Sequence, residues 1–380
     1  MKTIKISLLC LLSLLFSICF AQSGFVHAAA DLEIGLVNSV TGEAASTGIY
    51  VQHGVEMAVA EWNAKGGVNG QKIKLITQDD TGQAAGAVNA FNKLIRNSKP
   101  MAVLLPNYSV MVMAIMPYLN DAGIPSLTGA TNPKITKQGN KLIFRFRTSD
   151  AIMAQLIAQY ALKQSDKIAI IHDTNEFGRG GADSLKETLA ASKVTPLITE
   201  GYNTGDKNFT AQLLNIQKSG AKVLLGWGHP LENGLIMKQL KELGINIQLI
   251  GAAPYGHPVA LNLAKDAAEG VIYAQEYCAF DKDPKVKDWA ARYQEKFKQV
   301  SEFNAATYYD GMNLILEVIQ KYKPANPKEM QAALEKVTSY QGVCGNFGFD
   351  SEHEGFRKAV IVKINKGTPE VIDKVEMPSK

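Results

Sequence analysis

After its first 30 residues, the chain alternates short apolar runs with longer segments of helical periodicity. The first apolar run is Leu32–Asn38. The segment Ile49–Asn63 follows it, with Val51 and Val55 at helical spacing. A second series of the same kind begins near Lys167–His172. Strands that alternate with helices predict parallel sheets covered by helices on both faces. We therefore expect an α/β protein with two lobes, each built on its own parallel sheet.

The length of 380 residues also suits two domains, at about 150 residues per domain. The helices expected after Phe280 have few strands of their own, so the simplest arrangement returns them to the first lobe. This predicts a first lobe of residues 31–147 plus 280–345, and a second lobe of residues 148–279 plus 346–380.

Residues 1–30 have the layout of a cleaved secretory signal peptide. Lys2 and Lys5 precede an apolar run of 15 residues, Ile6–Phe20, and small residues follow, ending at Ala30. The alternative is an uncleaved anchor, but the apolar run is short for a membrane span. We favour cleavage after Ala30 over cleavage after Ala28, and we expect an exported, periplasmic protein.

Removing the leader leaves a nearly neutral chain of 38 basic and 36 acidic residues, because the leader contributes two lysines and no acid. The chain has no concentrated basic run, so we expect no nucleic-acid partner. Its remaining cysteines are Cys278 and Cys344. An isolated pair in an oxidising compartment predicts a disulfide, with two buried free thiols as the alternative. We expect a monomer.

Motifs of catalysis and of cofactor binding are absent from the sequence. It contains no phosphate-binding Gly-x-x-x-x-Gly-Lys-Ser/Thr loop, no Gly-x-Ser-x-Gly nucleophile elbow, no His-Glu-x-x-His and no Cys-x-x-Cys. Glu352-His353-Glu354 could bind a metal, but its polar, glycine-flanked setting favours a solvated loop. We therefore expect no enzyme, cofactor or metal site, with a secreted α/β hydrolase as a remote alternative.

Polar and aromatic residues follow the predicted strands at their carboxyl ends, where open α/β sheets bind ligands. The first series supplies mainly hydroxyl and backbone groups, and the second supplies aromatic rings. Together they would hold the polar end of a small molecule and enclose its apolar body. The candidate ligand-binding residues are Tyr108, Ser109, Thr128, Ala130, Thr131, Phe177, Trp227, Gly228 and Tyr255.

Several segments, in order along the chain, carry a family resemblance. They include Asn63-Ala64-Lys65-Gly66-Gly67-Val68-Asn69-Gly70, Asp121-Ala122-Gly123-Ile124-Pro125 and Tyr309-Asp310-Gly311. With them the chain resembles the type I periplasmic solute-binding proteins, specifically the leucine/isoleucine/valine-binding family of ABC transporters. The resemblance implies two Rossmann-like lobes joined by three hinge strands, which close on an amino acid or similar small carboxylate and deliver it to a membrane permease.

The resemblance also implies roles for some of the candidates. Ser109 matches the position that meets the ligand carboxylate, and Ala130 and Thr131 match positions that meet its amine and carboxylate. Phe177 matches a position where the family has an aromatic residue of the second lobe, and Trp227-Gly228 falls near another such position. A ligand-sensing receptor subunit shares this fold and is an alternative function.

One loop departs from the family pattern. Amino-acid binders of this family place an acid after the strand that corresponds to Gln248–Gly251, where it pairs with the ligand ammonium. Here the residues are Ala252-Ala253-Pro254-Tyr255, with no acid. A buried ammonium without a counter-charge is costly. Either another acid such as Asp173 or Asp310 replaces it, or the ligand is an aromatic carboxylate without an ammonium group.

Overall fold

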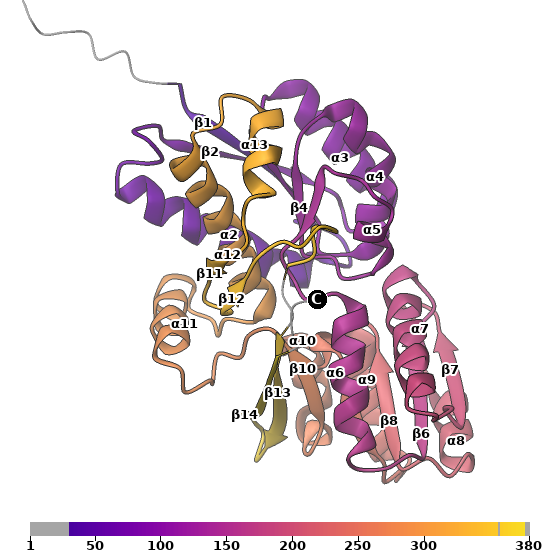
Figure 1. The fold of residues 1–380 in the computed structure, drawn as a ribbon. Coiled ribbons are helices and arrows are strands. Elements are labelled where there is room, and N and C mark those ends of the chain that lie inside the picture. Colours follow the sequence, from indigo (N-terminus) through magenta and orange to yellow (C-terminus); the bar gives the residue numbers. More distant parts are fainter. Residues whose placement is uncertain (1–29, 356–357, 377–380) are drawn as a thin grey trace, which may run out of the picture.

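The computed structural model describes residues 30–355 and 358–376, and they form two α/β lobes, one above the other in Figure 1. The signal peptide expected at residues 1–30 lies outside the described residues except for Ala30. Among the described helices, none combines the length and apolarity needed to cross a membrane.

The first lobe is built on a five-stranded sheet in the order β2-β1-β3-β4-β5, in which every neighbouring pair is parallel. Its strands are β1 (Leu32–Asn38), β2 (Ile73–Asp79), β3 (Val103–Leu105), β4 (Ser126–Thr128) and β5 (Ile143–Arg145). The parallel sheet expected from the first series is therefore confirmed. All residues of β3, β4 and β5 are buried, as expected where helices cover both faces.

The helices of this lobe come from two distant parts of the chain. The early ones are α2 (Ala45–Ala64), α3 (Ala84–Asn97), α4 (Ser109–Ala122) and α5 (Lys134–Lys137), and the late ones are α11 (Pro284–Phe297), α12 (Phe303–Tyr322) and α13 (Pro327–Leu334). The long helix α12 packs on α2 so closely that a Cβ on Gly54 would lie 2.1 Å from the carbonyl oxygen of Ala305. This packing supports the discontinuous first lobe expected from the sequence.

The second lobe is built on a seven-stranded sheet in the order β14-β13-β10-β9-β8-β6-β7. Its parallel strands are β6 (Ile168–Asp173), β7 (Ile198–Tyr202), β8 (Val223–Trp227), β9 (Gln248–Gly251) and β10 (Ile272–Gln275). The hairpin β13 (Lys358–Asn365) and β14 (Thr368–Glu376) adds two antiparallel strands at the edge. Its tight turn uses Lys366 and Gly367, both at positive φ. The second sheet is thus mixed.

Two apolar layers cover the faces of this sheet. Helices α6 (Asp150–Leu162) and α7 (Glu176–Ala191) pack on the face that contains Ile170 and Leu225. Helices α8 (Thr210–Lys218), α9 (Pro230–Glu242) and α10 (Pro258–Ala264) pack on the face that contains Ile171 and Leu224. Neighbouring residues of a strand point to opposite faces, so each apolar strand supplies both layers.

The chain passes between the lobes three times: after β5, after β10 and before β13. Residues 346–355, which the sequence suggested for the second lobe, pack on the first instead. The short strand β12 (Asn346–Phe347) pairs with β11 (Tyr340–Gln341), and the ring of Phe349 lies 5.1 Å from that of Phe144. The last crossing therefore begins about ten residues later than expected.

Two further expectations are corrected. His353 and Glu354 are buried rather than solvated: the imidazole of His353 stacks on Phe144 at 4.0 Å, and Glu354 pairs with the buried guanidinium of Arg145 at 3.0 Å. Cys278 and Cys344 are both free and buried, so the expected disulfide is not formed in this structure. Burial raises the pKa of the Cys278 thiol to about 11, which makes it an inert, protonated side chain.

Candidate functional site

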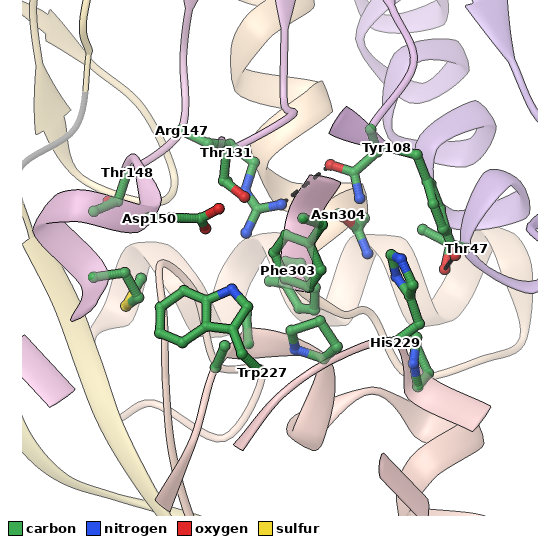
Figure 2. Close-up of a pocket in the computed structure, with 17 residues that line it drawn as sticks. Thr47, Tyr108, Thr131, Arg147, Thr148, Asp150, Trp227, His229, Phe303 and Asn304 are labelled. Carbon is green, nitrogen blue, oxygen red and sulfur yellow. Dashed lines mark hydrogen bonds between the residues drawn. The ribbon is translucent and has the colours of Figure 1, made fainter. Parts of the chain in front are cut away.

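A cavity lies between the two lobes, at the carboxyl ends of the strands in both sheets (Figure 2). Loops after β3, β4, β8 and β9 contribute to it, as do the starts of α6 and α12. This is where open α/β sheets bind their ligands. The lining residues are Thr47, Asn107, Tyr108, Thr131, Arg147, Thr148, Asp150, Met153, Phe177, Trp227, His229, Pro230, Ala252, Ala253, Pro254, Phe303 and Asn304.

Four of the nine residues expected from the sequence line this cavity: Tyr108, Thr131, Phe177 and Trp227. The other five lie behind its wall: Ser109, Thr128, Ala130, Gly228 and Tyr255. The positions of the predicted strand ends therefore indicated where the cavity lies, but they did not indicate which side chains face into it.

In the first lobe, the residues behind the wall hold the lining loop in place. The hydroxyl oxygen of Ser109 accepts a hydrogen bond from the backbone N–H of Asn132 at 3.2 Å. Thr128 donates its hydroxyl to the carbonyl oxygen of Pro106 and accepts the backbone N–H of Ala130. The carbonyl oxygen of Ala130 accepts from Nη1 of the buried Arg145 at 2.7 Å. These groups are satisfied by the protein itself and position Thr131.

In the second lobe, Gly228 and Tyr255 serve packing. A Cβ on Gly228 would lie 1.7 Å from the hydroxyl oxygen of Tyr202, so only glycine fits there. The Tyr255 ring packs against Gly226 and Gly251 at the ends of β8 and β9, where a Cβ on either glycine would lie 2.1 Å from Tyr255. Tyr255 is therefore part of the core beneath the cavity.

Arg147, which the sequence analysis missed, enters the cavity from the first crossing segment. Its Nε and Nη2 donate to the two carboxylate oxygens of Glu276 at 3.1 and 3.0 Å. Its Nη1 donates to the side-chain oxygen of Asn107 at 3.1 Å and to the carbonyl oxygen of Gly129 at 3.3 Å. These bonds use four of its five N–H donors. Among the described residues, the second N–H of Nη2 has no partner and is available to a ligand. Burial opposes the charge of Arg147, but Glu276 more than offsets this and raises its pKa.

Asp150, also missed, is the first residue of α6 and only 2% exposed. Its Oδ2 has no hydrogen-bond partner among the described residues. Burial raises the pKa of this carboxyl to about 7, against the opposing effects of Thr131, Arg145 and Arg147. In Figure 2, Asp150, Thr131 and Arg147 lie together on one side of the cavity, next to the indole of Trp227. An aspartate at a helix start is normally interpreted as a cap, so nothing in the sequence marked Asp150 as a residue of the cavity.

On the opposite side of the cavity, two stacked aromatic rings connect the lobes. Tyr108 of the first lobe stacks on His229 of the second, with centroids 4.6 Å apart and planes 21° apart. Burial lowers the pKa of His229 to about 4, so its imidazole is neutral at pH 7. Asn132 also crosses the cleft, where its Nδ2 donates to the carbonyl oxygen of Glu176 at 2.5 Å. The lobes are therefore in contact at two places beside the cavity, which is a closed arrangement.

An aromatic wall completes the site. The rings of Phe177 and Trp227 lie 6.2 Å apart, and Phe303 faces the Arg147 guanidinium at 4.7 Å. The indole Nε1 of Trp227 and the side-chain oxygen of Asn304 are buried without a hydrogen-bond partner among the described residues. The cavity thus combines an apolar surface with both a free donor and free acceptors.

Two α/β lobes, three crossings and a closed cavity between them define a two-lobed binding protein. The sequence agrees, because residues 31–369 match the family model described as periplasmic binding protein. The chain belongs to the periplasmic binding protein family, whose members bind solutes and are not enzymes.

Curated relatives match over most of their length. The chain is 31% identical over 347 residues to the leucine-, isoleucine-, valine-, threonine- and alanine-binding protein of Pseudomonas aeruginosa, covering 90% of this chain and 92% of that protein.

Solved structures share the fold. One is the branched-chain amino acid transporter substrate-binding protein LivJ of Streptococcus pneumoniae in complex with isoleucine, with a TM-score of 0.85 and 24% identity, covering 91% of this chain and all of that one. Another is an ABC-transporter solute-binding protein of Rhodopseudomonas palustris in complex with 3,4-dihydroxybenzoic acid, with a TM-score of 0.83 and 23% identity, covering 91% of this chain and 97% of that one. The expected two-lobe fold is confirmed.

Proposed function

We propose that this protein is the extracytoplasmic solute-binding component of an ABC importer. It captures an amino acid or a similar small carboxylate between its closing lobes and delivers it to a membrane permease. In this role the protein works in the periplasm as a monomer, exported by a signal peptide that is then removed.

The observation that carries this proposal is the mixed character of the cavity. Arg147 and Trp227 each offer an N–H donor, which suits a ligand carboxylate. Asp150 and Asn304 offer free acceptor oxygens, which suit a ligand ammonium. The aromatic wall suits an apolar side chain. An amino acid has these three features, and the Pseudomonas aeruginosa relative is named for binding five amino acids.

An aromatic carboxylate is the second candidate. The loop after β9 contributes Ala252, Ala253 and Pro254 to the cavity and no acid, and Phe177, Trp227 and Phe303 would enclose a flat ring. The Rhodopseudomonas palustris protein that shares the fold was solved with such a ligand.

Calorimetric titration of the mature chain with leucine, phenylalanine and benzoate separates the two candidates. We expect one-to-one binding of at least one of the amino acids, more tightly than benzoate. Tight binding of benzoate with no binding of either amino acid would favour the second candidate. Absence of binding to all three would contradict the proposed function.

A further inference from the structure

We propose that Asp150 receives the ammonium group of the ligand and makes the site selective for amino acids over carboxylates that lack this group. The proposal rests on the proposed function and specifies its ligand class. It assigns the role of the acid that is missing after β9 to the first residue of α6, which lines the same cavity.

The position of Asp150 suits this role. Its backbone N–H donates to the carbonyl oxygen of Thr131 at 2.8 Å, which ties the start of α6 to the loop after β4 across the first crossing. Its side chain lines the cavity, is buried, and keeps Oδ2 without a hydrogen-bond partner in the described structure. A buried carboxylate oxygen that lacks a donor is destabilising until a donor arrives. A ligand ammonium supplies that donor together with a compensating charge.

The two acids suggested by the sequence already accept hydrogen bonds from other groups of the protein. Asp173 accepts the Thr204 hydroxyl at 2.9 and 2.8 Å and the backbone N–H of Asn175 at 3.0 Å. Asp310 accepts the backbone N–H groups of Val343 and Cys344, both at 2.8 Å. Neither carboxylate lines the cavity.

Two other buried acids near the cavity also accept hydrogen bonds from the protein. Glu276 holds Arg147 with both oxygens. Glu302 caps α12, where it accepts the backbone N–H of Ala305 at 3.1 Å and the side-chain amide of Asn304 at 3.0 Å. Among the described residues, Asp150 is therefore the acid that lines the cavity and has a carboxylate oxygen without a hydrogen-bond partner.

The charges around Asp150 also favour an amino acid over a simple carboxylate as the ligand. Arg147 is paired with Glu276, and Arg145 is paired with Glu354 at 3.0 Å, so neither arginine brings an uncompensated positive charge. A simple carboxylate would place a second negative charge in the cavity with an ionised Asp150. An amino acid brings its own ammonium and avoids this repulsion.

The test uses ligand pairs that differ only in the amino group: leucine with 4-methylpentanoate, and phenylalanine with 3-phenylpropanoate. Calorimetry on the mature protein is expected to show at least a 100-fold preference for the amino acid of one pair, as sites built to bind a polar group reject analogues without it. In Asp150→Asn, which keeps the shape of the side chain, this preference should shrink to less than tenfold. Asp173→Asn is the matched control and should keep it.

Thermal unfolding without ligand shows whether each variant is folded, and the ligand pairs test the wild-type protein even if a variant is not. Equal affinity of the wild type for both members of the pair it binds would overturn the role of Asp150 and leave the proposed function standing. If folded Asp150→Asn keeps the wild-type preference for the amino acid over its analogue, the role of Asp150 is likewise overturned and the proposed function still stands. If the wild type binds none of the four compounds, the proposed function fails and the inference fails with it.

Discussion

The guanidinium of Arg147 and the carboxylate of Glu276 form two hydrogen bonds, of 3.1 and 3.0 Å, between two of the segments that connect the lobes. Both side chains are buried. The pair fixes the crossings to each other at the edge of the cavity and leaves one N–H of Arg147 unpaired among the described residues. In the proposed function, this N–H receives the ligand carboxylate, which connects the geometry of the hinge with ligand recognition.

Glu276→Gln should destabilise the protein by about 3 kcal/mol, because it leaves a buried guanidinium without its counter-charge. Urea denaturation of the ligand-free protein measures this change. Glu242→Gln is the control, since Glu242 forms an exposed pair with Lys238 at 3.7 Å and its loss should cost less than about 1 kcal/mol. Equal effects of the two substitutions would show that the buried pair has no special role in stability.

Affinity for an amino acid should fall as the pH is lowered from 7 to 5. Burial raises the pKa of Asp150 to about 7, so below that value a proton competes with the ligand ammonium for the carboxylate. The expected loss approaches tenfold per pH unit well below pH 7, and amounts to about 50-fold between pH 7 and pH 5. Calorimetric titrations at several pH values measure it.

Two other titratable groups near the cavity, His229 and Glu302, do not mimic this dependence. Burial lowers the pKa of His229 to about 4 and raises that of Glu302 to about 8, so neither changes its charge substantially between pH 5 and 7. Asp150→Asn should therefore show nearly constant affinity over this range. A wild-type affinity that is also constant would contradict pairing of the ammonium with an ionised Asp150.

Trp227→Phe should weaken ligand binding by about tenfold or more, because it removes the free indole N–H while keeping an aromatic ring. Stability without ligand should also fall, by about 1–3 kcal/mol, because the smaller ring leaves space where the buried Trp227 is packed. Titration and thermal unfolding of the same preparation separate the two effects. Unchanged affinity would remove Trp227 from the set of ligand donors.

Ser109→Ala should act on stability more than on ligand affinity. The Ser109 hydroxyl accepts the buried N–H of Asn132, and loss of that acceptor costs about 1–3 kcal/mol. Thr131→Ala, which alters the cavity wall directly, should reduce affinity more than Ser109→Ala does. A larger loss of affinity in Ser109→Ala would place its hydroxyl in direct contact with the ligand, as the family resemblance implies.

Much of the fold could be predicted because it depends on local patterns. The alternation of strands and helices predicted both sheets, and strand ends led to Tyr108 and Trp227 because the carboxyl ends of parallel strands share one edge. Ser109 and Tyr255 lie behind the cavity wall for a different reason. Which side chain of a loop faces the cavity depends on the turn that follows each strand, and strand periodicity does not determine that turn.

Arg147, Asp150 and Glu276 could not be found in this way. Arg147 and Glu276 lie 129 positions apart in the sequence, and only the crossings between the lobes bring them together. In the sequence, Arg147 is the end of a strand-like segment and Asp150 is the start of a helix. Their functional positions depend on how the two lobes close, which is a tertiary property.

The most direct measurement is a crystal structure of the mature protein purified without unfolding and solved with an amino acid identified by titration. We expect closed lobes around that amino acid, with its nitrogen within hydrogen-bond distance of Asp150 Oδ2 and its carboxylate near Arg147 and Trp227. An amino acid bound in the cleft with its nitrogen away from Asp150 would contradict the assigned ammonium site. A ligand bound outside the cleft would contradict the proposed function.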